Sequence, residues 1–281
     1  MRYRESEDKT IEPEGCRPEP HVASAFFVKR AQLMFTEVYG DLLKDHWFVY
    51  EWQGRGSVHL HGLLWMSDAP GLSPPAELVA RLKSGILPEQ EYTSKMAEWA
   101  HYYGSYISGF NPAVLHQEDE DHADAGADTA KGYSANPPVE RLPALGKHVC
   151  ALRFGELQDH LDFKYLANFC NRHVKCRPGV CLKVDRRTKE EYCKAGAPWP
   201  CSCTPCFMPS KRRRGELDFV PVRNDPLMNN IPTRHFLKWR ANTDMKPVFA
   251  QHALEVYLTK YLTKAEVATD DLCRLTDNVI A

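Results

Sequence analysis

The stretch HWFVYEWQGRGSVHLHGLLWM, residues 46–66, predicts two antiparallel β-strands joined by a tight turn. Residues 46–53 are rich in aromatic and β-branched side chains, and residues 57–66 form a second such run after a Gly-Arg-Gly turn. Because side chains alternate between the two faces of a strand, His59 and His61 point to one face, about 7 Å apart along the chain. The stretch therefore predicts a β-hairpin that presents two imidazoles side by side.

Two histidines held in this way can bind one divalent metal ion together. Glu51 and Gln53 share a face of the partner strand, and either could supply an oxygen as third ligand. Two nitrogens and one oxygen leave coordination positions open, as a catalytic metal requires. The alternative is that both histidines are ordinary residues of a half-exposed strand, and the motif alone leaves the two readings open.

Apolar residues recur at helical spacing in four segments before and after this hairpin in the sequence. These segments are residues 21–43, 74–110, 145–170 and 251–266. The first segment predicts an amphipathic helix that ends near Gly40, and residues 239–250 predict a further strand. The pattern predicts an α+β fold, an antiparallel sheet with the histidine strand near its centre and helices on its faces.

The last helix carries the second group of reactive side chains. Tyr257 and Tyr261 are four residues apart and share one helix face, and Lys260 and Lys264 lie on the same stripe. A phenol with a pKa of about 10 must lose its proton to attack a phosphodiester, and nearby cations favour the phenolate. The alternative is a pair of amphipathic core tyrosines with solvated lysines.

Composition limits the class of protein. The 281 residues are 43% hydrophobic, which provides for a sizeable core and excludes wholesale disorder. No apolar run reaches about 18 residues, so no membrane span is expected. The polar start, MRYRESEDKT, is not a signal peptide. The net charge of −1 hides a segregation, because residues 170–214 hold twelve Lys or Arg against three Asp or Glu.

Seven of the ten cysteines lie between Cys170 and Cys206. Without a secretory signal, crowded cysteines indicate metal ligands in a reducing, intracellular setting. His173, Cys176, Cys181 and Cys193 have the spacing H-x₂-C-x₄-C-x₁₁-C, which suits a structural zinc ion with one nitrogen and three sulfur ligands. The remaining four could form a second zinc site or a thiol cluster: Cys170, Cys201, Cys203 and Cys206.

The same segment is a candidate DNA-binding surface, because basic side chains suit phosphate contacts. They are Arg172, Lys175, Arg177, Arg186, Arg187, Lys211, Arg212, Arg213 and Arg214. Trp199, Tyr192 and Phe207 could stack on unpaired bases, although packing is the simpler role for single aromatics. The alternatives are a solvated face, or a nuclear-import signal for residues 211–214.

The two reactive motifs together resemble the HUH endonucleases, a superfamily of replication initiators, relaxases and transposases. EWQGRGSVHLHGLLW, residues 51–65, is similar to the second Rep motif of Helitron transposases. WRANTDMKPV, residues 239–248, and YLTKYLTKAE, residues 257–266, are similar to their third motif with its paired tyrosines. The cysteine module resembles the zinc-binding segment inserted in that family.

This resemblance implies a fold and a chemistry. It implies a central antiparallel sheet of HUH type, with His59 and His61 binding Mg²⁺ or Mn²⁺ and Gln53 preferred to Glu51 as third ligand. Tyr257 or Tyr261 would attack single-stranded DNA at transposon ends and target, giving a 5′-phosphotyrosine and a free 3′-OH. Lys260 and Lys264 would hold phosphate oxygens. The implied role is strand cleavage and transfer in rolling-circle-type transposition in the nucleus.

The domain plan expected from these patterns has one elaborated nuclease domain. Residues 1–20 form a loose lead-in, without the Thr/Ser-rich first motif of the family, and residues 21–281 form the HUH domain. That domain contains an acidic mobile insertion at 111–143 and the zinc module at 170–207. Family members continue into a helicase, and the expected plan of residues 1–281 includes none. Two rival functions remain: a non-catalytic zinc-dependent DNA-binding module from a decayed or domesticated transposase, and an unrelated metallohydrolase.

Overall fold

The structure is a computed structural model that describes residues 20–52, 58–115, 136–153, 155–210, 215–249 and 251–262. The chain divides into two compact units. Unit 1 combines residues 1–68 with residues 252–281, and unit 2 comprises residues 69–251. The predicted hairpin and the predicted tyrosine helix therefore belong to the same unit, although most of the chain separates them in sequence.

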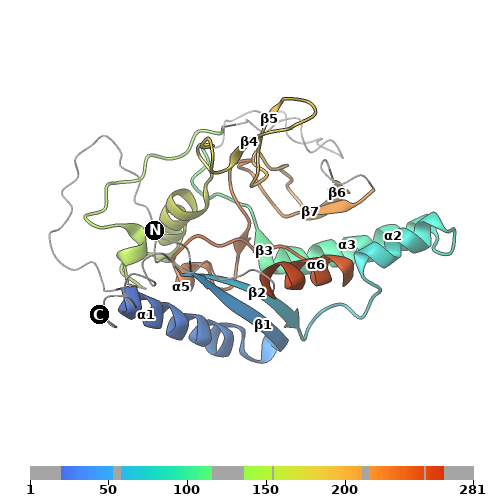
Figure 1. Cartoon of the computed structure of the whole chain (residues 1–281), viewed down its shortest axis with the longest axis horizontal. Coiled ribbons are helices and arrows are strands. Elements are labelled where there is room, and N and C mark those ends of the chain that lie inside the picture. The colour runs from blue at the N-terminus through green and yellow to red at the C-terminus, as the bar shows by residue number, and fades with distance from the viewer. Residues whose placement is uncertain are drawn as a thin grey trace, which may run out of the picture. The chain divides into compact units, whose positions relative to one another are not determined.

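Unit 1 contains the hairpin, a long N-terminal helix and the last helix (Figure 1). Its elements are α1 (Pro20–Leu33), a π-helical segment (Met34–Tyr39), a 3₁₀ turn (Gly40–Leu42), β1 (Leu43–Trp52), β2 (Val58–Met66) and α6 (Gln251–Leu262). The first helix gives way to the 3₁₀ turn at Gly40, whose φ of +45° is readily adopted only by glycine. The hairpin and the first and last helices expected from the sequence are confirmed.

The two strands of the hairpin pair antiparallel from Trp52 opposite Val58 to Leu43 opposite Met66. The register shifts once, between Leu43 and Asp45. At the open end the backbone N–H of Ser67 donates to the carbonyl of Leu42 at 2.8 Å. This pairing fixes which side chains share a face, because directly opposed residues point the same way.

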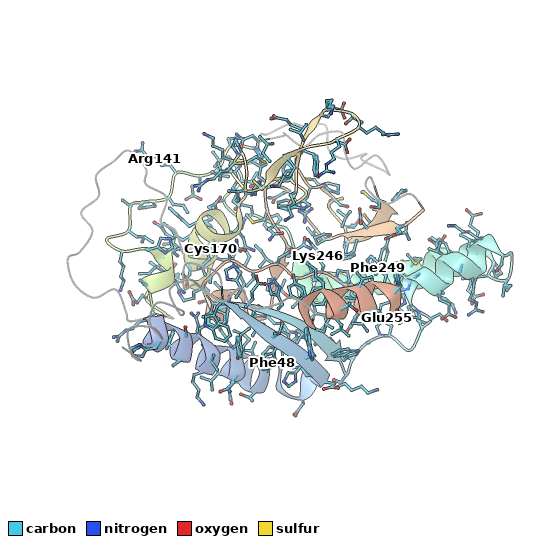
Figure 2. All side chains as sticks on the ribbon, viewed as in Figure 1. Phe48, Arg141, Cys170, Lys246, Phe249 and Glu255 are labelled. Atoms are coloured by element: carbon cyan, nitrogen blue, oxygen red, sulfur yellow. The ribbon has the colours of Figure 1, made fainter. Side chains whose placement is uncertain are left out.

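One face of the hairpin is covered by aromatic packing from the N-terminal helix. Phe35 stacks on Phe48 and on His46, each with ring centroids 4.9 Å apart (Figure 2 shows Phe48). Phe27 meets Tyr50 edge-on at 6.2 Å. Not every apolar residue of the helix is used, since Phe26 remains 66% exposed. The opposite face of the hairpin carries the histidines.

Unit 2 holds the remaining helices and three short strand pairs. Its helices are α2 (Pro75–Lys83), α3 (Glu89–Tyr106), α4 (Asp159–Leu166) and α5 (Phe236–Trp239), with a 3₁₀ turn at Val149–Ala151 and a π-helical segment at Ala167–Asn171. Its strands are β3 (Ile107–Ser108), β4 (Leu182–Val184), β5 (Glu191–Cys193), β6 (Cys206–Pro209), β7 (Leu217–Val220) and β8 (Ile231–Pro232). None of the helices in the described part of the chain has the length and apolar character that a membrane crossing requires.

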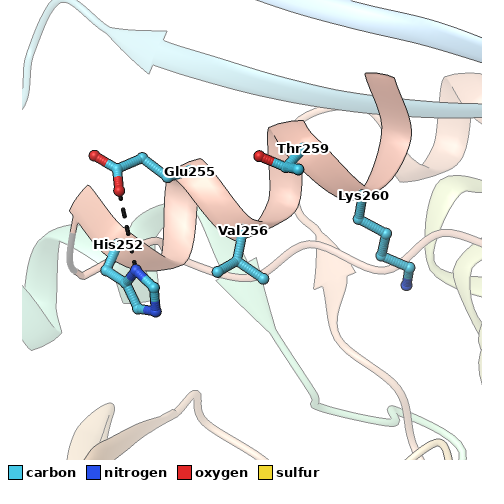
Figure 3. Close-up of a pocket in the computed structure, with 5 residues that line it drawn as sticks. All are labelled: His252, Glu255, Val256, Thr259 and Lys260. Atoms are coloured by element: carbon cyan, nitrogen blue, oxygen red, sulfur yellow. Dashed lines mark ion pairs between the residues drawn. The ribbon is translucent and has the colours of Figure 1, made fainter. Parts of the chain in front are cut away.

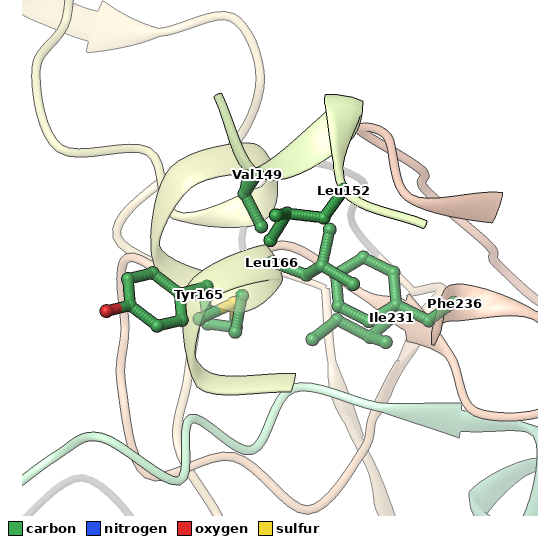
Figure 4. Packing of buried hydrophobic residues seen from close by; sticks show 8 residues of the cluster. Val149, Leu152, Tyr165, Leu166, Ile231 and Phe236 are labelled. Carbon is green, nitrogen blue, oxygen red and sulfur yellow. The ribbon is translucent and has the colours of Figure 1, made fainter. Parts of the chain in front are cut away.

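The core of unit 2 has two hydrophobic clusters. The larger joins α4 to the 3₁₀ turn and α5 through Val149, Leu152, Tyr165, Leu166, Ala167, Met228, Ile231 and Phe236 (Figure 4). The smaller joins α2 to α3 through Leu78, Leu87, Met96 and Trp99. The larger cluster combines residues that precede the cysteine module with residues that follow it.

Two predicted helices are interrupted. The segment 74–110 forms α2 and α3 with a break at residues 84–88, where Pro88 restarts the helix and disfavours helical backbone in the residue before it. Within 145–170, only α4 and the two short helical segments form. The apolar spacing there reflects packing into the larger cluster more than one continuous helix.

The strand predicted at 239–250 is wrong. Trp239 ends α5, and residues 241–249 have no regular secondary structure. Asparagine side chains satisfy this backbone in place of a neighbouring strand: Asn171 binds both the N–H and the carbonyl of Thr243, and the Asn230 amide donates to Met245 at 2.8 Å. The segment is thus held by long-range side-chain contacts that its own pattern does not reveal.

The strands do not assemble into one central sheet within the described residues. They form four separate two-stranded antiparallel sheets, β1–β2, β3–β8, β4–β5 and β6–β7, and β2 pairs with β1 alone. This corrects the expectation that the histidine strand lies near the centre of a larger sheet. The strand expected at 239–250 does not form, so it cannot extend the hairpin. The mixture of helices and antiparallel strands is that of an α+β fold.

The two described ends of the acidic insertion are tied together. Val114 and Val139 form an antiparallel bridge, and the N–H groups of Leu115 and Glu140 donate to the carbonyls of Pro138 and Ala113. Residues 116–135, on which the expectation of mobility rested, lie outside the described part of the chain. Residues 1–19, the expected lead-in, also lie outside it.

Candidate active site and metal centre

The free face of the hairpin gathers the polar side chains that the sequence singled out. Glu51 stands directly opposite His59, and Val49 stands opposite His61, so Glu51 and both histidines share this face. The Nε2 atom of His61 lies 3.1 Å from the Oε2 atom of Glu51, and both side chains are about a quarter exposed. An imidazole and a carboxylate therefore converge on the face that the N-terminal helix leaves open.

The donor set on this face fits a divalent ion only in part. His59, His61 and Glu51 offer nitrogen and oxygen ligands, and His61 and Glu51 already converge. Within the described residues, however, three or more candidate ligand atoms lie within 4.8 Å of one another only in the cysteine module. Gln53, the preferred third ligand, falls outside the described residues, and the observed pair involves Glu51.

Helix α6 brings its tyrosines to the histidine face. The ring of Tyr261 stacks on that of His61, with centroids 4.1 Å apart and planes inclined by 25°. Tyr257 lies one turn earlier, with its ring 4.7 Å from that of Tyr261. Both tyrosines are half-buried, and Leu254 and Leu258 beside them are half-buried too. The Tyr261 ring thus rests against His61, and the Tyr257 ring lies next to it on the same stripe.

A cation accompanies the tyrosines. The Nζ atom of Lys260 lies 5.1 Å from the centroid of the Tyr261 ring, within the range of a cation–π contact. Lys264 lies outside the described residues. The opposite side of α6 is an exposed stripe around a shallow hollow, lined by His252, Glu255, Val256, Thr259 and Lys260 (Figure 3). The helix therefore turns its phenols inward and a polar face outward.

In unit 2 the structure brings together the four residues expected to bind zinc. The ligand atoms of His173, Cys176, Cys181 and Cys193 all lie within 4.8 Å of one another. The Nε2 atom of His173 is 3.3, 3.7 and 3.4 Å from the sulfurs of Cys176, Cys181 and Cys193. A tetrahedral zinc ion with ordinary bond lengths requires nitrogen–sulfur distances of about 3.5 Å. This cluster could bind a metal ion such as zinc.

Backbone groups around the cluster donate hydrogen bonds to two of its sulfurs, those of Cys181 and Cys193. The N–H of Arg177 donates to the Cys181 sulfur at 3.2 Å. Burial alone would raise the pKa of Cys193, but hydrogen bonds from Cys176 and from the backbone of residues 195–197 lower it below its usual value. Burial, with the neighbouring Cys193 and Cys181 sulfurs, raises the pKa of Cys176 to about 12. Sulfurs crowded in this way favour a bound cation, which would offset the negative charge of their thiolate forms.

A comparison with known families bears on this arrangement. Residues 3–64 match the family model described as the Helitron helicase-like domain at the N-terminus. Over these residues the chain is similar to the N-terminal domain of Helitron-type transposases. No curated protein and no solved structure matches the chain. The match covers α1 and most of the hairpin, including both histidines, and it starts within the segment that the sequence analysis treated as a lead-in.

The Helitron-type match does not reach the other two motifs. The cysteine module and the tyrosine helix lie beyond residue 64, so their roles rest on this chain's own geometry. The match implies a transposase-related role and interaction with DNA. It leaves the cleavage chemistry and the metal to be argued from the residues themselves.

Within the described residues, the other four cysteines are not part of any group of three or more side chains that could hold a metal ion. Cys170 packs against the larger hydrophobic cluster, and Cys203 is exposed. Cys201 is buried, and this burial raises its pKa to about 12. Cys206 begins β6 and lies 3.7 Å from the Ser202 hydroxyl.

Arg172 is not a surface contact for DNA. Its guanidinium binds Asp225 at 2.6 Å, and its side chain is only 7% exposed. The guanidinium also donates to the Asn136 side chain and to the carbonyl of Pro137. Sequence reasoning counted this arginine with the basic surface because the partner, Asp225, lies far along the chain. Its role in the structure is to hold the module in place.

The other basic candidates of the module are exposed where they are described. These are Lys175, Arg177, Arg186 and Arg187, whereas residues 211–214 lie outside the described part of the chain. Tyr192 is exposed, but Trp199 packs edge-on against His173 and Phe207 packs among Tyr103, Phe219 and Phe249. Of the three aromatics considered for base stacking, only Tyr192 therefore has an open face.

Sequence reasoning missed one acidic residue that organises this surface. Asp185 accepts hydrogen bonds from the backbone N–H groups of Arg187 and Thr188, at 2.8 Å each. An aspartate that binds the backbone two residues ahead is typical of a turn, so the Asp-Arg-Arg-Thr order was a signal. A count of charges over residues 170–214 includes Asp185 only as one negative charge and says nothing of its hydrogen bonds.

Proposed function

We propose that the chain is a metal-dependent endonuclease and strand transferase that acts on single-stranded DNA through a tyrosine. The proposal rests mainly on the stacking of Tyr261 on His61, with ring centroids 4.1 Å apart. The histidine motif and the tyrosine motif, each of which could have a purely structural role on its own, lie in one compact unit. The Helitron-type match over the hairpin supports the same function from an independent direction.

The residues around this contact suit phosphoryl transfer. His59, His61 and Glu51 would hold Mg²⁺ or Mn²⁺, which when bound supplies charge neutralisation at the scissile phosphate. Lys260 would hold a phosphate oxygen, and its position over the Tyr261 ring supports this role. Lys264 and Gln53 remain candidates on the strength of their spacing alone.

The covalent step conserves the energy of the phosphodiester. The phenol oxygen of Tyr261 forms a bond to phosphorus while the bond from phosphorus to the 3′ oxygen breaks. The proton lost by the phenol ends on that oxygen as a free 3′-OH. A 3′-OH can reverse the step and join strands, and the neighbouring Tyr257 would allow a second cleavage.

The test is a search for a covalent adduct. The full chain is incubated with 5′- and 3′-labelled single-stranded oligonucleotides and Mn²⁺, and the products are separated under denaturing conditions. A denaturant-resistant adduct on the 3′ fragment is expected, together with a free 3′-OH on the other. An adduct that persists in the double variant Tyr257→Phe, Tyr261→Phe would disprove the nucleophile.

Metal dependence provides a second test of the site. The double variant His59→Ala, His61→Ala should lose the Mn²⁺-dependent adduct while keeping its zinc, because the two centres share no ligand. Glu51→Gln removes the carboxylate that pairs with His61 and should raise the Mn²⁺ concentration needed for half-maximal reaction. His46→Ala is the matched control, since His46 stacks on Phe35 on the covered face of the same hairpin.

A non-catalytic DNA-binding module is the second candidate, and the His173 cluster is the observation that favours it. In that case the chain would bind DNA in a zinc-dependent way and form no adduct with any sequence. A metallohydrolase unrelated to transposases would instead give chelator-sensitive hydrolysis without an adduct. The half-buried position of Tyr261 against His61 supports the tyrosine mechanism over both.

The finer parts of the proposal rest on the family. They are transposon ends and target as the single-stranded substrates, a helicase as partner, rolling-circle transposition and a nuclear place of action. The basic run at residues 211–214 is consistent with nuclear import. We also retain the plan of one nuclease domain from residue 21 onward, elaborated by the insertions at 111–143 and 170–207.

A further inference from the structure

The hairpin formed by β4 and β5 is closed at its base by the candidate zinc site. Cys181 directly precedes β4, and Cys193 is the last residue of β5. Leu182 pairs with Cys193 across the two strands. The N–H of Lys194 donates to the carbonyl of Cys181 at 2.6 Å. Two of the four cluster residues thus clamp the two ends of one short ribbon, so a bound ion would order the whole hairpin.

The tip of the same hairpin is ordered by Asp185. Its carboxylate accepts the two backbone hydrogen bonds from Arg187 and Thr188, and these bonds lower its pKa. Its own N–H donates to the carbonyl of Glu190, and its carbonyl accepts from the N–H of Lys189. Lys189 adopts φ of +61°, which is uncommon for a residue with a side chain. The tip is therefore a defined turn, whose acidic group faces its own backbone.

This turn presents a run of cations to solvent. Arg186, Arg187 and Lys189 are exposed at the tip, and Lys175, Arg177 and Lys194 are exposed near the base. The strands themselves are uncovered, since Val184 is 55% and Tyr192 is 44% exposed. Such a surface is complementary to a polyanion with regularly spaced charges.

We propose that the β4–β5 hairpin is a preordered phosphate-binding element for DNA, positioned by the metal cluster at its base and by Asp185 at its tip. The inference rests on the proposed function, which makes DNA the substrate, and it adds the place and manner of binding. Arg186 and Arg187 contact the phosphodiester backbone. Asp185 is a positioning residue, because its carboxylate binds the turn and not the ligand.

Substitution of Asp185 tests the proposal, because a role in net charge and a role in positioning the arginines predict opposite changes in DNA affinity. Asp185→Ala raises the net charge by one unit, so a surface that acts by charge alone would bind DNA more tightly. If the carboxylate positions the arginines, the same variant binds more weakly. Glu190→Gln is the matched control, since it makes the same charge change at an exposed carboxylate of the same hairpin.

The experiment measures dissociation constants of the full chain for labelled single-stranded and duplex oligonucleotides by fluorescence anisotropy across a salt series. Without added Mg²⁺ or Mn²⁺ the DNA stays uncleaved. We expect Asp185→Ala to weaken binding several-fold relative to wild type and Glu190→Gln to leave it equal or slightly tighter. We expect Arg186→Ala, Arg187→Ala to reduce the slope of log K against log salt by about 1.4–1.8, from two lost phosphate contacts.

The proposal is overturned if Asp185→Ala binds as tightly as Glu190→Gln, or if the double arginine variant keeps the wild-type slope on both DNAs. Zinc content is measured for every variant. If Asp185→Ala loses zinc, the proposal is judged by the slope of log K against log salt in the double arginine variant. An effect on the single strand assigns the hairpin to the cleaved strand, and an effect confined to duplex assigns it to a flanking duplex.

These outcomes are separable from those of the cleavage reaction. His46→Ala, on the covered face of the β1–β2 hairpin in the other unit, should bind both DNAs like the wild type. A chain that binds through the hairpin but forms no adduct would refute the nuclease and retain the inference. If the wild-type chain forms the adduct but the double arginine variant binds DNA with unchanged affinity, the nuclease is retained and the hairpin inference is refuted.

Discussion

The ring centroid of Tyr261 lies 4.1 Å from that of His61, and the Nε2 atom of His61 lies 3.1 Å from the Oε2 atom of Glu51. The chain thus aligns a phenol, an imidazole and a carboxylate within one compact unit. The order matters for mechanism, because it distinguishes the two tyrosines. Tyr261 stacks directly on His61, and Tyr257 lies beside it, with its ring centroid 4.7 Å from that of Tyr261.

This difference predicts unequal effects of removing each hydroxyl. Tyr261→Phe keeps the ring and its stacking but removes the nucleophile, so the first adduct should fall by about 100-fold or more. Tyr257→Phe should retain that adduct and impair only a second cleavage. The measurement is the yield of covalent adduct with time on a labelled single strand.

The control for this pair is folding. Because both variants keep an aromatic ring, the free energy of unfolding should change by less than about 1 kcal/mol. If Tyr257→Phe abolishes the adduct and Tyr261→Phe does not, the order of the two tyrosines is reversed.

Metal binding by the His173 cluster predicts one zinc ion per chain. Cys193→Ser removes a buried ligand and should lower the zinc content well below one per chain, with loss of order in the β4–β5 hairpin. Cys203→Ser, an exposed cysteine of the same module, should retain full zinc. Elemental analysis of purified chains measures this, and full zinc in Cys193→Ser would contradict the ligand set.

Arg172 should affect stability more than DNA affinity. Removing it leaves the Asp225 carboxylate buried without its cation, which typically costs about 3–5 kcal/mol. Arg177→Ala, at an exposed arginine of the same module, should change stability by less than about 1 kcal/mol. Chemical denaturation compares the two, and equal stabilities would show that the Arg172 pair is not needed for folding.

His235 predicts a pH dependence of stability in unit 2. Burial lowers its pKa to about 4, whereas the unfolded chain titrates near the ordinary value of 6.5. The unfolded state therefore binds more protons between these values, and stability falls as pH is lowered from about 6.5 to about 4. The loss should be of the order of 3 kcal/mol.

The variant His235→Gln should flatten this part of the profile. His252→Gln is the matched control, since the His252 side chain is 86% exposed and should leave the profile unchanged. The measurement is the denaturation midpoint across that pH range. An identical slope in His235→Gln and wild type would show that other groups cause the pH dependence.

Local patterns were sufficient for the hairpin, for α1 and α6, and for the grouping of the zinc candidates. Strand alternation put His59 and His61 on one face, and helical spacing put Tyr257 and Tyr261 on one stripe. The four-residue metal cluster followed from short spacings, because ligands within about twenty residues can converge through turns alone. Each of these inferences depends only on the geometry of nearby residues.

Residues 239–250 show where local patterns fail. Their composition favoured a strand, but a strand requires a partner, and the side chains of Asn171 and Asn230 take up the backbone groups instead. Arg240 begins this segment in a left-handed conformation and forms a buried ion pair with Asp162. Neither the asparagines nor the aspartate could be identified from the segment itself.

The sequence by itself therefore determined which chemical groups the chain carries and which of them share a local face. Only the tertiary structure decided which groups meet. It brought Tyr261 to His61, buried Arg172 against Asp225, and turned the Asp185 carboxylate onto its own backbone. The reason is physical: backbone periodicity acts over a few residues, whereas these contacts depend on burial and charge pairing between segments distant in the chain.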